Sequence, residues 1–145
     1  MRVLDKGRLT MGACALGASQ KLLDMCVDYA KQRVQFGMPI GQFQMVQAML
    51  ADMATEIYAA RQMLYHAAWL RDQGKKITRE AAMVKLFCTE MGSRIADKAI
   101  QIFGGMGYMK ELPVEMFYRD VRLYRIFEGT SEIQRVVIAR NLLKE

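Results

Sequence analysis

One acidic residue, Glu128, lies in a turn where it could act as a general base. It follows two apolar residues and comes shortly before Thr130, a good helix N-cap. An apolar setting disfavours the ionised carboxylate and raises its pKa, which suits proton removal near neutral pH. The amide groups after Thr130 would form a partly positive helix start suited to a phosphate. The alternative is an ordinary surface glutamate paired with Arg122 or Arg125.

A second turn, residues 33–44, combines an arginine, a phenylalanine, two glycines and a proline around one corner. It could form a cleft for a planar or phosphorylated ligand, with Arg33 as a bidentate phosphate donor. It could equally be a helix C-terminus, with Arg33 favourably placed at the negative end of the helix dipole. The spacing alone does not decide between the two.

A third turn, residues 101–108, has three glycines in four positions. Glycines permit positive φ angles and let a ligand or another backbone approach closely. The spacing differs from the dinucleotide-binding fingerprint, and the turn ends a helix rather than opening one. The alternative is a glycine-rich helix stop. If the three turns form one site, we expect Glu128 to lie near the two glycine-bearing corners.

The elements that must position these turns are helices, because apolar residues recur every three or four positions and no segment alternates like a strand. We expect a first helix from near Asp5 to the Gly37-Met38-Pro39 break, a second from Gln42 to about Gln73, and a third with Thr78 as N-cap. Lys75 and Lys76 would form a solvated turn. A short helix starts at Pro113 and a last one follows Thr130. The expected fold is an all-α antiparallel four-helix bundle with a short extra helix, a single domain over residues 1–145.

The apolar stripes that define the expected core can be given residue by residue. They comprise Leu16, Leu23, Val27, Ala30 and Val34; then Leu50, Met53, Ile57, Ala60, Leu64 and Ala67; and finally Val84, Cys88, Met91, Ile95, Ala99 and Ile102.

Composition excludes several function classes. The 145 residues carry a net charge of +6, which favours anionic partners, but Lys and Arg alternate with acids on every helix, which argues against nucleic-acid binding. One histidine rules out a multi-histidine metal site, and we expect no metal. Three cysteines without a CxxC pair indicate a reducing compartment, and we expect Cys14, Cys26 and Cys88 in the core. No apolar run approaches the ~20 residues of a membrane span.

Four motifs together give the chain a family resemblance. They are Leu4-Asp5-Lys6-Gly7-Arg8, then Arg-x-Gln-Phe-Gly-x-Pro-Ile from Arg33, then Gln-Ile-Phe-Gly-Gly-x-Gly from Gln101, and finally Glu-Gly-Thr-Ser-x-Ile-Gln from Glu128. In this order and spacing, the chain resembles the C-terminal domain of the acyl-CoA dehydrogenases. These flavin enzymes introduce a double bond between the α and β carbons of acyl-CoA thioesters.

The resemblance implies that Glu128 is the catalytic base that removes the α-proton while a hydride passes from the β carbon to FAD. Its backbone N–H and a flavin hydroxyl would hold the thioester oxygen. Some members carry the base instead at the position of Gly7, which has no side chain here, so the role falls to Glu128. Asp5, Arg8 and Gly129 would bind the acyl-CoA substrate.

The resemblance also implies two sets of FAD contacts. The first set would reach the FAD of a neighbouring subunit: Arg33, Gln35, Phe36, Gln44, Gln101, Ile102, Phe103, Gly104 and Gly105. The second set would contact the FAD of the same subunit: Thr130, Ser131 and Glu132. Glu132 replaces a glutamine of some relatives, and a carboxylate near a pyrophosphate is unfavourable.

The family further implies partners and missing parts. We expect an electron-transfer flavoprotein as electron acceptor and a homo-oligomer, a dimer of dimers. The enzyme would be cytoplasmic in a bacterium and in the mitochondrial matrix in a eukaryote. The N-terminal helical and middle β domains are lacking, so the chain alone should bind FAD weakly or not at all and should not turn over. The alternative is an acyl-CoA oxidase or another flavoenzyme of the same superfamily.

Overall fold

A computed structural model of the chain describes residues 2–144, which form helices and one very small hairpin. The elements follow in the order α1 (Arg2–Gln32), β1 (Val34–Gln35), β2 (Met38–Pro39), the 3-10 helix η1 (Ile40–Gln42), α2 (Gln44–Asp72), α3 (Thr78–Phe103), α4 (Gly105–Tyr108), α5 (Val114–Tyr124) and α6 (Ser131–Leu142).

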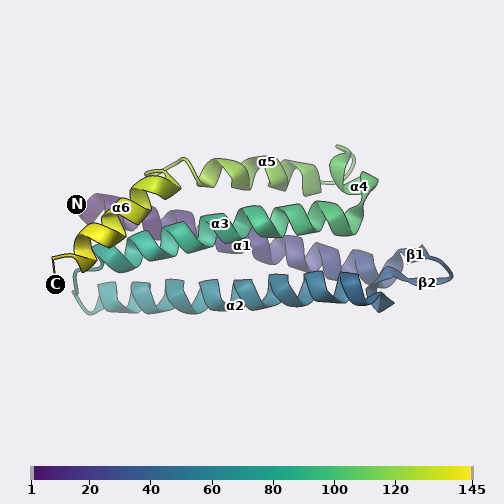
Figure 1. The fold of residues 1–145 in the computed structure, drawn as a ribbon, viewed down its shortest axis with the longest axis horizontal. Coiled ribbons are helices and arrows are strands. Elements are labelled where there is room, and N and C mark those ends of the chain that lie inside the picture. The colour runs from purple at the N-terminus through teal and green to yellow at the C-terminus, as the bar shows by residue number, and fades with distance from the viewer. Residues whose placement is uncertain (1, 145) are drawn as a thin grey trace.

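The three long helices lie along the same axis, and each reverses the direction of the one before it (Figure 1). α5 then runs back along α3, and α6 lies obliquely across the end of the bundle that holds the start of α1. α3 is the central element, since it contacts α1, α2, α4, α5 and α6. The predicted all-α antiparallel bundle is confirmed.

The apolar stripes predict the core well on two of the three long helices. On α3 all six predicted residues are buried, and on α2 five of six are buried while Leu50 is half-buried. On α1 Leu16 and Ala30 are buried as predicted, but between them Leu22 and Cys26 are buried where Leu23 and Val27 were expected. Val34 lies outside the helix and is exposed.

Small residues explain why the buried face of α1 differs from its apolar stripe. A Cβ added to Gly12 would lie 2.6 Å from Cγ1 of Val84, so α1 and α3 approach closely at this point. Gly92 of α3 in turn lies against Ser19 and Ala15 of α1. Close packing of the two backbones therefore buries alanine, serine and glycine, which carry little weight in a hydrophobicity pattern.

The corner between α1 and α2 contains a hairpin that the sequence did not predict. Val34 pairs with Pro39 and Gln35 with Met38 in antiparallel register. Phe36 and Gly37, with φ angles of 52° and 82°, form the two-residue turn between them. Positive φ at both central positions is what a tight hairpin turn requires.

Three further expectations need correction. Thr78 is the first residue of α3 rather than its N-cap, which is Ile77, and Pro113 immediately precedes α5. The segment after Gly104 forms the short helix α4, for which the sequence analysis made no prediction. Cys14 is exposed, although Cys26 and Cys88 are buried and burial raises the pKa of each thiol to about 12.

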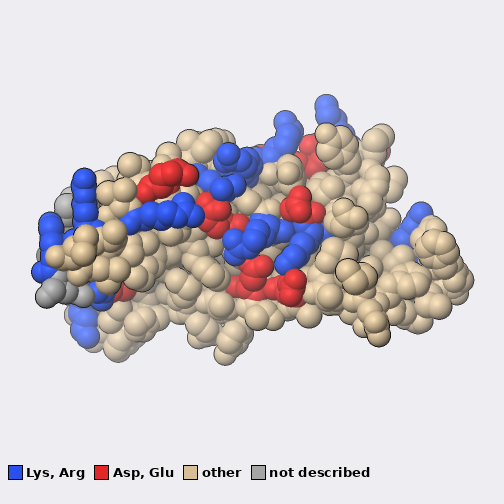
Figure 2. All heavy atoms as spheres, viewed as in Figure 1, with Lys and Arg blue, Asp and Glu red and all other residues tan. Residues whose placement is uncertain are grey.

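Basic and acidic side chains alternate over the face drawn in Figure 2, and several of them pair. The ion pairs of the described residues include Arg94–Glu56, Lys98–Asp52, Lys98–Glu56, Arg119–Glu115 and Arg125–Glu90. Within residues 2–144, no helix is long and apolar enough to cross a bilayer, and no group of acidic, cysteine or histidine side chains could hold a metal ion.

Candidate active site

The turn that carries Glu128 is held in an unusual backbone conformation. We call residues 125–130, between α5 and α6, the base loop. Glu128 has a φ of 53° and Gly129 a φ of 90°. Nε2 of Gln134, on the first turn of α6, donates to the carbonyl oxygens of Glu128 (3.1 Å) and Gly129 (2.9 Å). A Cβ on residue 129 would lie 2.7 Å from that nitrogen, so the loop requires glycine there.

The carboxylate of Glu128 lies against Gly7 of α1. A Cβ added to Gly7 would lie 2.9 Å from Cδ of Glu128 and closer still to Oε2. The rest of the side chain is exposed, and so are the flanking Ile126 (52%) and Phe127 (43%). The expected apolar setting of Glu128 is therefore not provided by residues 2–144.

Of the alternative for Glu128, a surface glutamate paired with Arg122 or Arg125, the structure shows the surface position but not the pairing. Arg125 pairs instead with Glu90 of α3, at 2.9 Å. Burial raises the pKa of Glu90, but hydrogen bonds with Ser131 and Arg125 and the positive charges of Arg125 and Arg135 outweigh that effect and leave the pKa below its usual range. Within the described part of the chain, no cation forms an ion pair with Glu128.

The backbone of the base loop also presents free donors. The N–H groups of Glu128 and Gly129 donate to no carbonyl or side chain of residues 2–144. Free N–H groups beside a carboxylate are what is needed to hold a carbonyl oxygen whose negative charge grows as the neighbouring carbon loses a proton.

The predicted substrate residues lie at the same end of the bundle. Asp5 and Arg8 lie close to Gly7 on α1, and both are buried. Nη1 of Arg8 donates to Oδ1 of Asp5 at 3.1 Å, and Oγ1 of Thr78 donates to Oδ2 at 2.9 Å. The carboxylate of Asp5 is therefore fixed between α1 and the start of α3.

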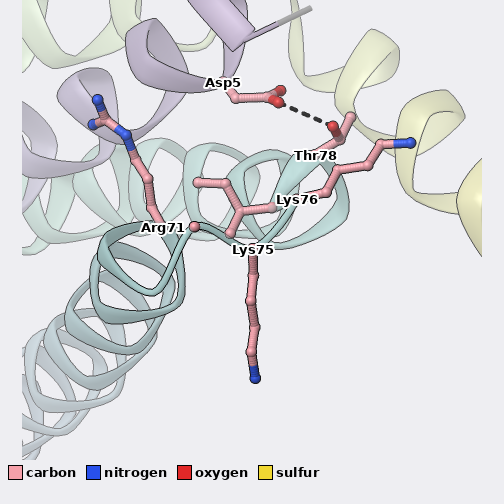
Figure 3. Close-up of a pocket in the computed structure, with 7 residues that line it drawn as sticks. Asp5, Arg71, Lys75, Lys76 and Thr78 are labelled. Carbon is pink, nitrogen blue, oxygen red and sulfur yellow. Dashed lines mark hydrogen bonds between the residues drawn. The ribbon is translucent and has the colours of Figure 1, made fainter.

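A pocket of about 480 Å³ opens beside Asp5. In Figure 3, Asp5 and Thr78 point toward each other, while the Lys75 side chain points away from them. The pocket is lined by Asp5, Arg71, Gly74, Lys75, Lys76, Ile77 and Thr78. The turn that the sequence presented as merely solvated thus brings Lys75 and Lys76 to the rim of a pocket next to the predicted substrate residues, where Arg71 of α2 also lies. The Lys75 ammonium lies over the Trp69 ring, 5.8 Å from its centroid.

The start of α6 is capped as predicted. Oγ1 of Thr130 accepts from the amide of Ile133 at 3.4 Å, and Ser131 is buried. The pKa of Glu132 lies below its usual range because its own backbone amide hydrogen-bonds to the carboxylate. That carboxylate therefore occupies amide groups that a phosphate would need.

The other two turns meet at the opposite end of the bundle. They line a hollow of about 570 Å³, formed by Tyr29, Arg33, Gln35, Ile40, Ile102, Phe103, Gly104, Gly105, Met106 and Met109. Six predicted cofactor residues are thereby brought together, while Phe36 (89% exposed), Gln44 and Gln101 lie outside the hollow.

The composition of this hollow fits a phosphate-bearing planar ligand. Tyr29 and Phe103 stack with ring centroids 4.1 Å apart and give it an apolar wall. A Cβ on Gly104 or Gly105 would meet nothing within 4 Å, so the backbone is open to a ligand. Within the described residues, Arg33 forms no ion pair, which leaves its guanidinium available for a phosphate.

The expectation that the three turns form one site is wrong for a single chain. Gly7, beside Glu128, and Tyr29, beside the hollow, are about 33 Å apart along α1 at 1.5 Å per residue. Figure 1 shows the hairpin and α4 at one end and the start of α6 at the other. The two sets of residues can serve one cofactor only if different copies of the chain supply them.

Sequence reasoning missed the burial of two polar residues and the contact of a third with Asp5. Gln134 and Lys85 are fully buried, and Thr78 binds Asp5. Each lies on a helix, and the spacing of apolar residues on a helix does not predict which of the polar residues between them are buried. The only signal was the position of Gln134 at the end of the Glu-Gly-Thr-Ser-x-Ile-Gln motif.

Comparison with known proteins gives a consistent result. Residues 1–143 match the family "Acyl-CoA dehydrogenase, C-terminal domain". A probable acyl-CoA dehydrogenase of Bacillus subtilis, YngJ, is 57% identical over 97% of this chain and 37% of its own length. The human mitochondrial short-chain specific acyl-CoA dehydrogenase is 49% identical over 99% of this chain and 35% of its own. The solved butyryl-CoA dehydrogenase of Megasphaera elsdenii has a TM-score of 0.97 at 43% identity, covering 99% of this chain and 37% of that one.

Two other relatives are described with a cofactor or with a partner protein. PigA was solved with FAD and proline and has a TM-score of 0.93 at 37% identity, covering 96% of this chain and 36% of that one. A subunit of the caffeyl-CoA reductase–Etf complex of Acetobacterium woodii is 47% identical, over all of this chain and 38% of its own. The chain thus spans little more than a third of the length of the relatives it matches.

Proposed function

Because the chain belongs to the acyl-CoA dehydrogenase family, as its C-terminal domain, we propose that it serves a flavin-dependent acyl-CoA dehydrogenase in which Glu128 removes the α-proton of an acyl-CoA thioester. The observation that carries the proposal is the position of the Glu128 carboxylate. It rests on Gly7, beside free backbone amides, at the end of the bundle that also holds Asp5 and Arg8.

The hydrogen bonds of the base loop hold in place the groups that proton removal would require. Gln134 fixes the carbonyl groups of Glu128 and Gly129, so that the carboxylate and the adjacent N–H groups keep a constant relative position. We propose that these N–H groups hold the thioester oxygen while Oε of Glu128 takes the proton from the neighbouring carbon. Such preorganised donors contribute most where charge develops. FAD, when bound, accepts the hydride that leaves the β carbon.

The exposed apolar residues near Glu128 support a partner surface at this end. Ile126, Phe127, Ile133 and Val136 are each at least 42% exposed. We propose that further domains of the enzyme cover them and exclude water from the carboxylate.

The basic pocket beside Asp5 is our candidate for the polar part of coenzyme A. Arg71, Lys75 and Lys76 lie at its rim, and the positive charge of Arg71 and Lys76 suits phosphate groups, whereas the Lys75 ammonium lies over the Trp69 ring. Asp5 and Arg8, fixed to each other and to Thr78, would mark the passage from this pocket toward Glu128.

We propose that the hollow at the opposite end binds the adenosine and pyrophosphate half of FAD held by a second copy of the chain. Arg33, Gly104 and Gly105 would bind the phosphates. The rest of this half of FAD would be bound by Gln35, Phe36, Gln44 and Gln101. The exposed Phe36, Met38, Met45, Met106 and Met109 surround the hollow, which favours a homo-oligomer. Thr130, Ser131 and Glu132 would contact the flavin of the same subunit, Glu132 least securely.

The same reasoning extends to the partners and the compartment. We propose an electron-transfer flavoprotein as acceptor, with the enzyme in the bacterial cytoplasm or the mitochondrial matrix according to its source. The 145-residue chain alone should fold as a bundle but retain little FAD, because each cofactor would be shared with parts outside it. Stoichiometric yellow flavin through purification of the chain would contradict this.

The test is Glu128→Gln in the full-length enzyme, with Glu111→Gln as a matched control on an exposed glutamate. Acyl-CoA should still perturb the flavin spectrum of the Glu128 variant, while flavin reduction should slow by about 10²–10⁴-fold, the usual contribution of a general base. Unchanged reduction would place the base elsewhere. Rapid reoxidation of the reduced wild type by oxygen would identify an acyl-CoA oxidase instead.

A further inference from the structure

Glu90 of α3 lies against both ends of the base loop. Its Oε1 accepts from Nε of Arg125, the first residue of the loop, at 2.9 Å. The hydroxyl of Ser131, the residue that follows the loop, donates to the same carboxylate. The Glu90 side chain is only 19% exposed, and Ser131 is buried. One carboxylate on the central helix therefore joins the two ends of the loop.

The backbone brings these two ends together at the same point. The N–H of Ser131 donates to the carbonyl oxygen of Arg125 at 3.0 Å. Between them the chain reverses its direction, and Glu128 and Gly129 take left-handed conformations there. A residue with a side chain rarely adopts such a φ, and the conformation persists only where the surrounding structure enforces it. The fixed ends of the loop are therefore a condition for the conformation of Glu128.

Glu90 holds the base loop in a different way from Gln134. Gln134 binds the carbonyl groups of Glu128 and Gly129, but it lies on α6, which directly follows the loop. Its hydrogen bonds therefore fix the loop relative to α6 only. Glu90 lies on α3, which packs against α1, the helix whose Gly7 lies against the Glu128 carboxylate. The bonds of Glu90 thus fix the loop relative to the bundle that supports the base.

The charges around Glu90 favour this hold. The pKa of Glu90 lies below its usual range, so the side chain is an anion near neutral pH. Hydrogen bonds to an ionised acceptor are roughly twice as strong as bonds between neutral groups. Arg135 of α6 lines a hollow of about 370 Å³ together with Glu90, on the side away from Arg125. Cations from the loop and from α6 therefore both attract this carboxylate.

Resting on the function proposed above, we propose that Glu90 is a positioning residue for proton removal. By binding Arg125 and Ser131, its carboxylate sets the place of the base loop on α3. The loop in turn sets the place of the Glu128 carboxylate beside Gly7. Glu90 acts through the loop and takes no proton itself.

The experiment uses the full-length holoenzyme and the variant Glu90→Leu, which removes both acceptor oxygens. Flavin reduction is measured at saturating acyl-CoA and expressed per bound FAD, so that unfolded or cofactor-free protein does not contribute. A displacement of the base should slow reduction by about 10- to 100-fold. The affinity for acyl-CoA, measured from the change in the flavin spectrum, should stay unchanged. A wild-type rate of reduction would overturn the proposal.

Glu56→Leu is the matched control. Glu56 accepts from Nε and Nη2 of Arg94, and its side chain is 22% exposed, so its setting is close to that of Glu90. The substitution breaks a similar ion pair of α3, but Glu56 lies on α2, which contacts mainly α1 and α3. This variant should keep the wild-type rate. Equal slowing in the two variants would overturn the proposal.

Two readouts separate positioning from a merely structural role. Glu90→Gln keeps the side-chain length and one acceptor oxygen, so it should reduce flavin faster than Glu90→Leu. Exchange of the α hydrogen with deuterated water is then followed in an acyl-CoA that the enzyme binds but cannot oxidise. In Glu90→Leu this exchange should slow by the same factor as flavin reduction. Wild-type exchange together with slow reduction would overturn the proposal.

A second variant keeps the inference testable if Glu90→Leu fails to fold. Arg125→Leu breaks the same ion pair from the side of the loop, and Arg94→Leu is its control on the pair with Glu56. Arg125→Leu should slow both flavin reduction and α-hydrogen exchange, whereas Arg94→Leu should slow neither. A wild-type rate of exchange in Arg125→Leu would overturn the proposal.

The two proposals fail separately. If Glu128→Gln exchanges the α hydrogen and reduces its flavin at the wild-type rates, the proposed function is wrong. If Glu128→Gln is inactive while Glu90→Leu and Arg125→Leu keep the wild-type rates, the proposed function stands and the role of Glu90 is wrong.

Discussion

The carboxylate of Glu128 occupies the space that a side chain on Gly7 would fill, with Cδ only 2.9 Å from the position of a Cβ on that glycine. The two residues are far apart in the sequence, and the fold brings α1 under the base loop. This contact gives a physical reason why a base at position 128 is compatible with glycine at position 7.

Gly7→Ala should therefore slow the enzyme without unfolding it. The added methyl group pushes the flexible end of Glu128 away, and a displacement of about 1 Å can cost up to ~10²-fold in rate. Alanine inside a helix is otherwise more stable than glycine by roughly 0.5–1 kcal/mol. We expect slower flavin reduction in the full-length enzyme with equal or higher stability.

Gly17→Ala is the matched control for Gly7→Ala. Gly17 lies on the same helix, and a Cβ there would meet nothing within 4 Å. It should gain the same helical stability and keep the wild-type rate. Equal rates in the two variants would show that the contact between Gly7 and Glu128 has no catalytic consequence.

Gln134→Met should loosen the base loop. The substitution removes the hydrogen bonds to the carbonyls of Glu128 and Gly129 and should destabilise the chain by about 1–3 kcal/mol in urea unfolding. Amide hydrogen exchange in residues 125–130 should accelerate. Gln47→Met, which removes one exposed bond to the Gly41 carbonyl, should cost about 1 kcal/mol or less and leave that exchange unchanged. Unaltered exchange in the Gln134 variant would contradict the anchoring role.

Glu90 should make stability depend on acidic pH. Its folded pKa is below the unfolded value of 4.5, so its contribution is fully present above that value and is lost as pH falls through the lowered pKa. Glu90→Gln should destabilise the chain by about 0.5–1 kcal/mol at pH 7. The difference from the wild type should disappear near pH 3. A difference that persists there would show that charge pairing with Arg125 is not its cause.

Arg33→Gln should weaken FAD binding in the assembled enzyme. Loss of a charge-assisted hydrogen bond to a phosphate costs about 1.5–3 kcal/mol, roughly 10- to 100-fold in Kd. Titration of the apoenzyme with FAD measures this, and reduction at saturating FAD should stay near the wild-type rate. Lys31→Gln, at the exposed end of α1 just before Arg33, should bind FAD normally. Equal affinities would remove Arg33 from the cofactor site.

The fold was predictable because the apolar residues of a long helix recur with the helical period on the face that becomes buried. Met53, Ile57 and Ala60 of α2 follow the helical period, and the structure buries all three. On α1 the prediction was right for Leu16 and Ala30 but missed Leu22 and Cys26, on a helix whose Gly12 and Ala15 let α3 approach closely. Interhelical distance depends on the partner helix, and a pattern within one segment does not contain it.

Only parts of the candidate site were predictable from the sequence. The motif residues around Glu128 and Arg33 were identified, but their separation by the length of α1 follows from topology. The burial of Lys85 and Gln134 gave no signal, because a polar residue on a helix is normally expected in solvent. It is known only from the structure.

Proton removal by Glu128 is tested most directly by exchange at the substrate α carbon in deuterated water, because exchange requires no hydride transfer. The full-length enzyme is incubated with an acyl-CoA that it binds but cannot oxidise, and deuterium at the α carbon is followed by mass spectrometry. The wild type should incorporate deuterium, and Glu128→Gln should do so at least about 100-fold more slowly while binding the same ligand. Equal incorporation in the two enzymes would contradict the assignment of Glu128 as the base.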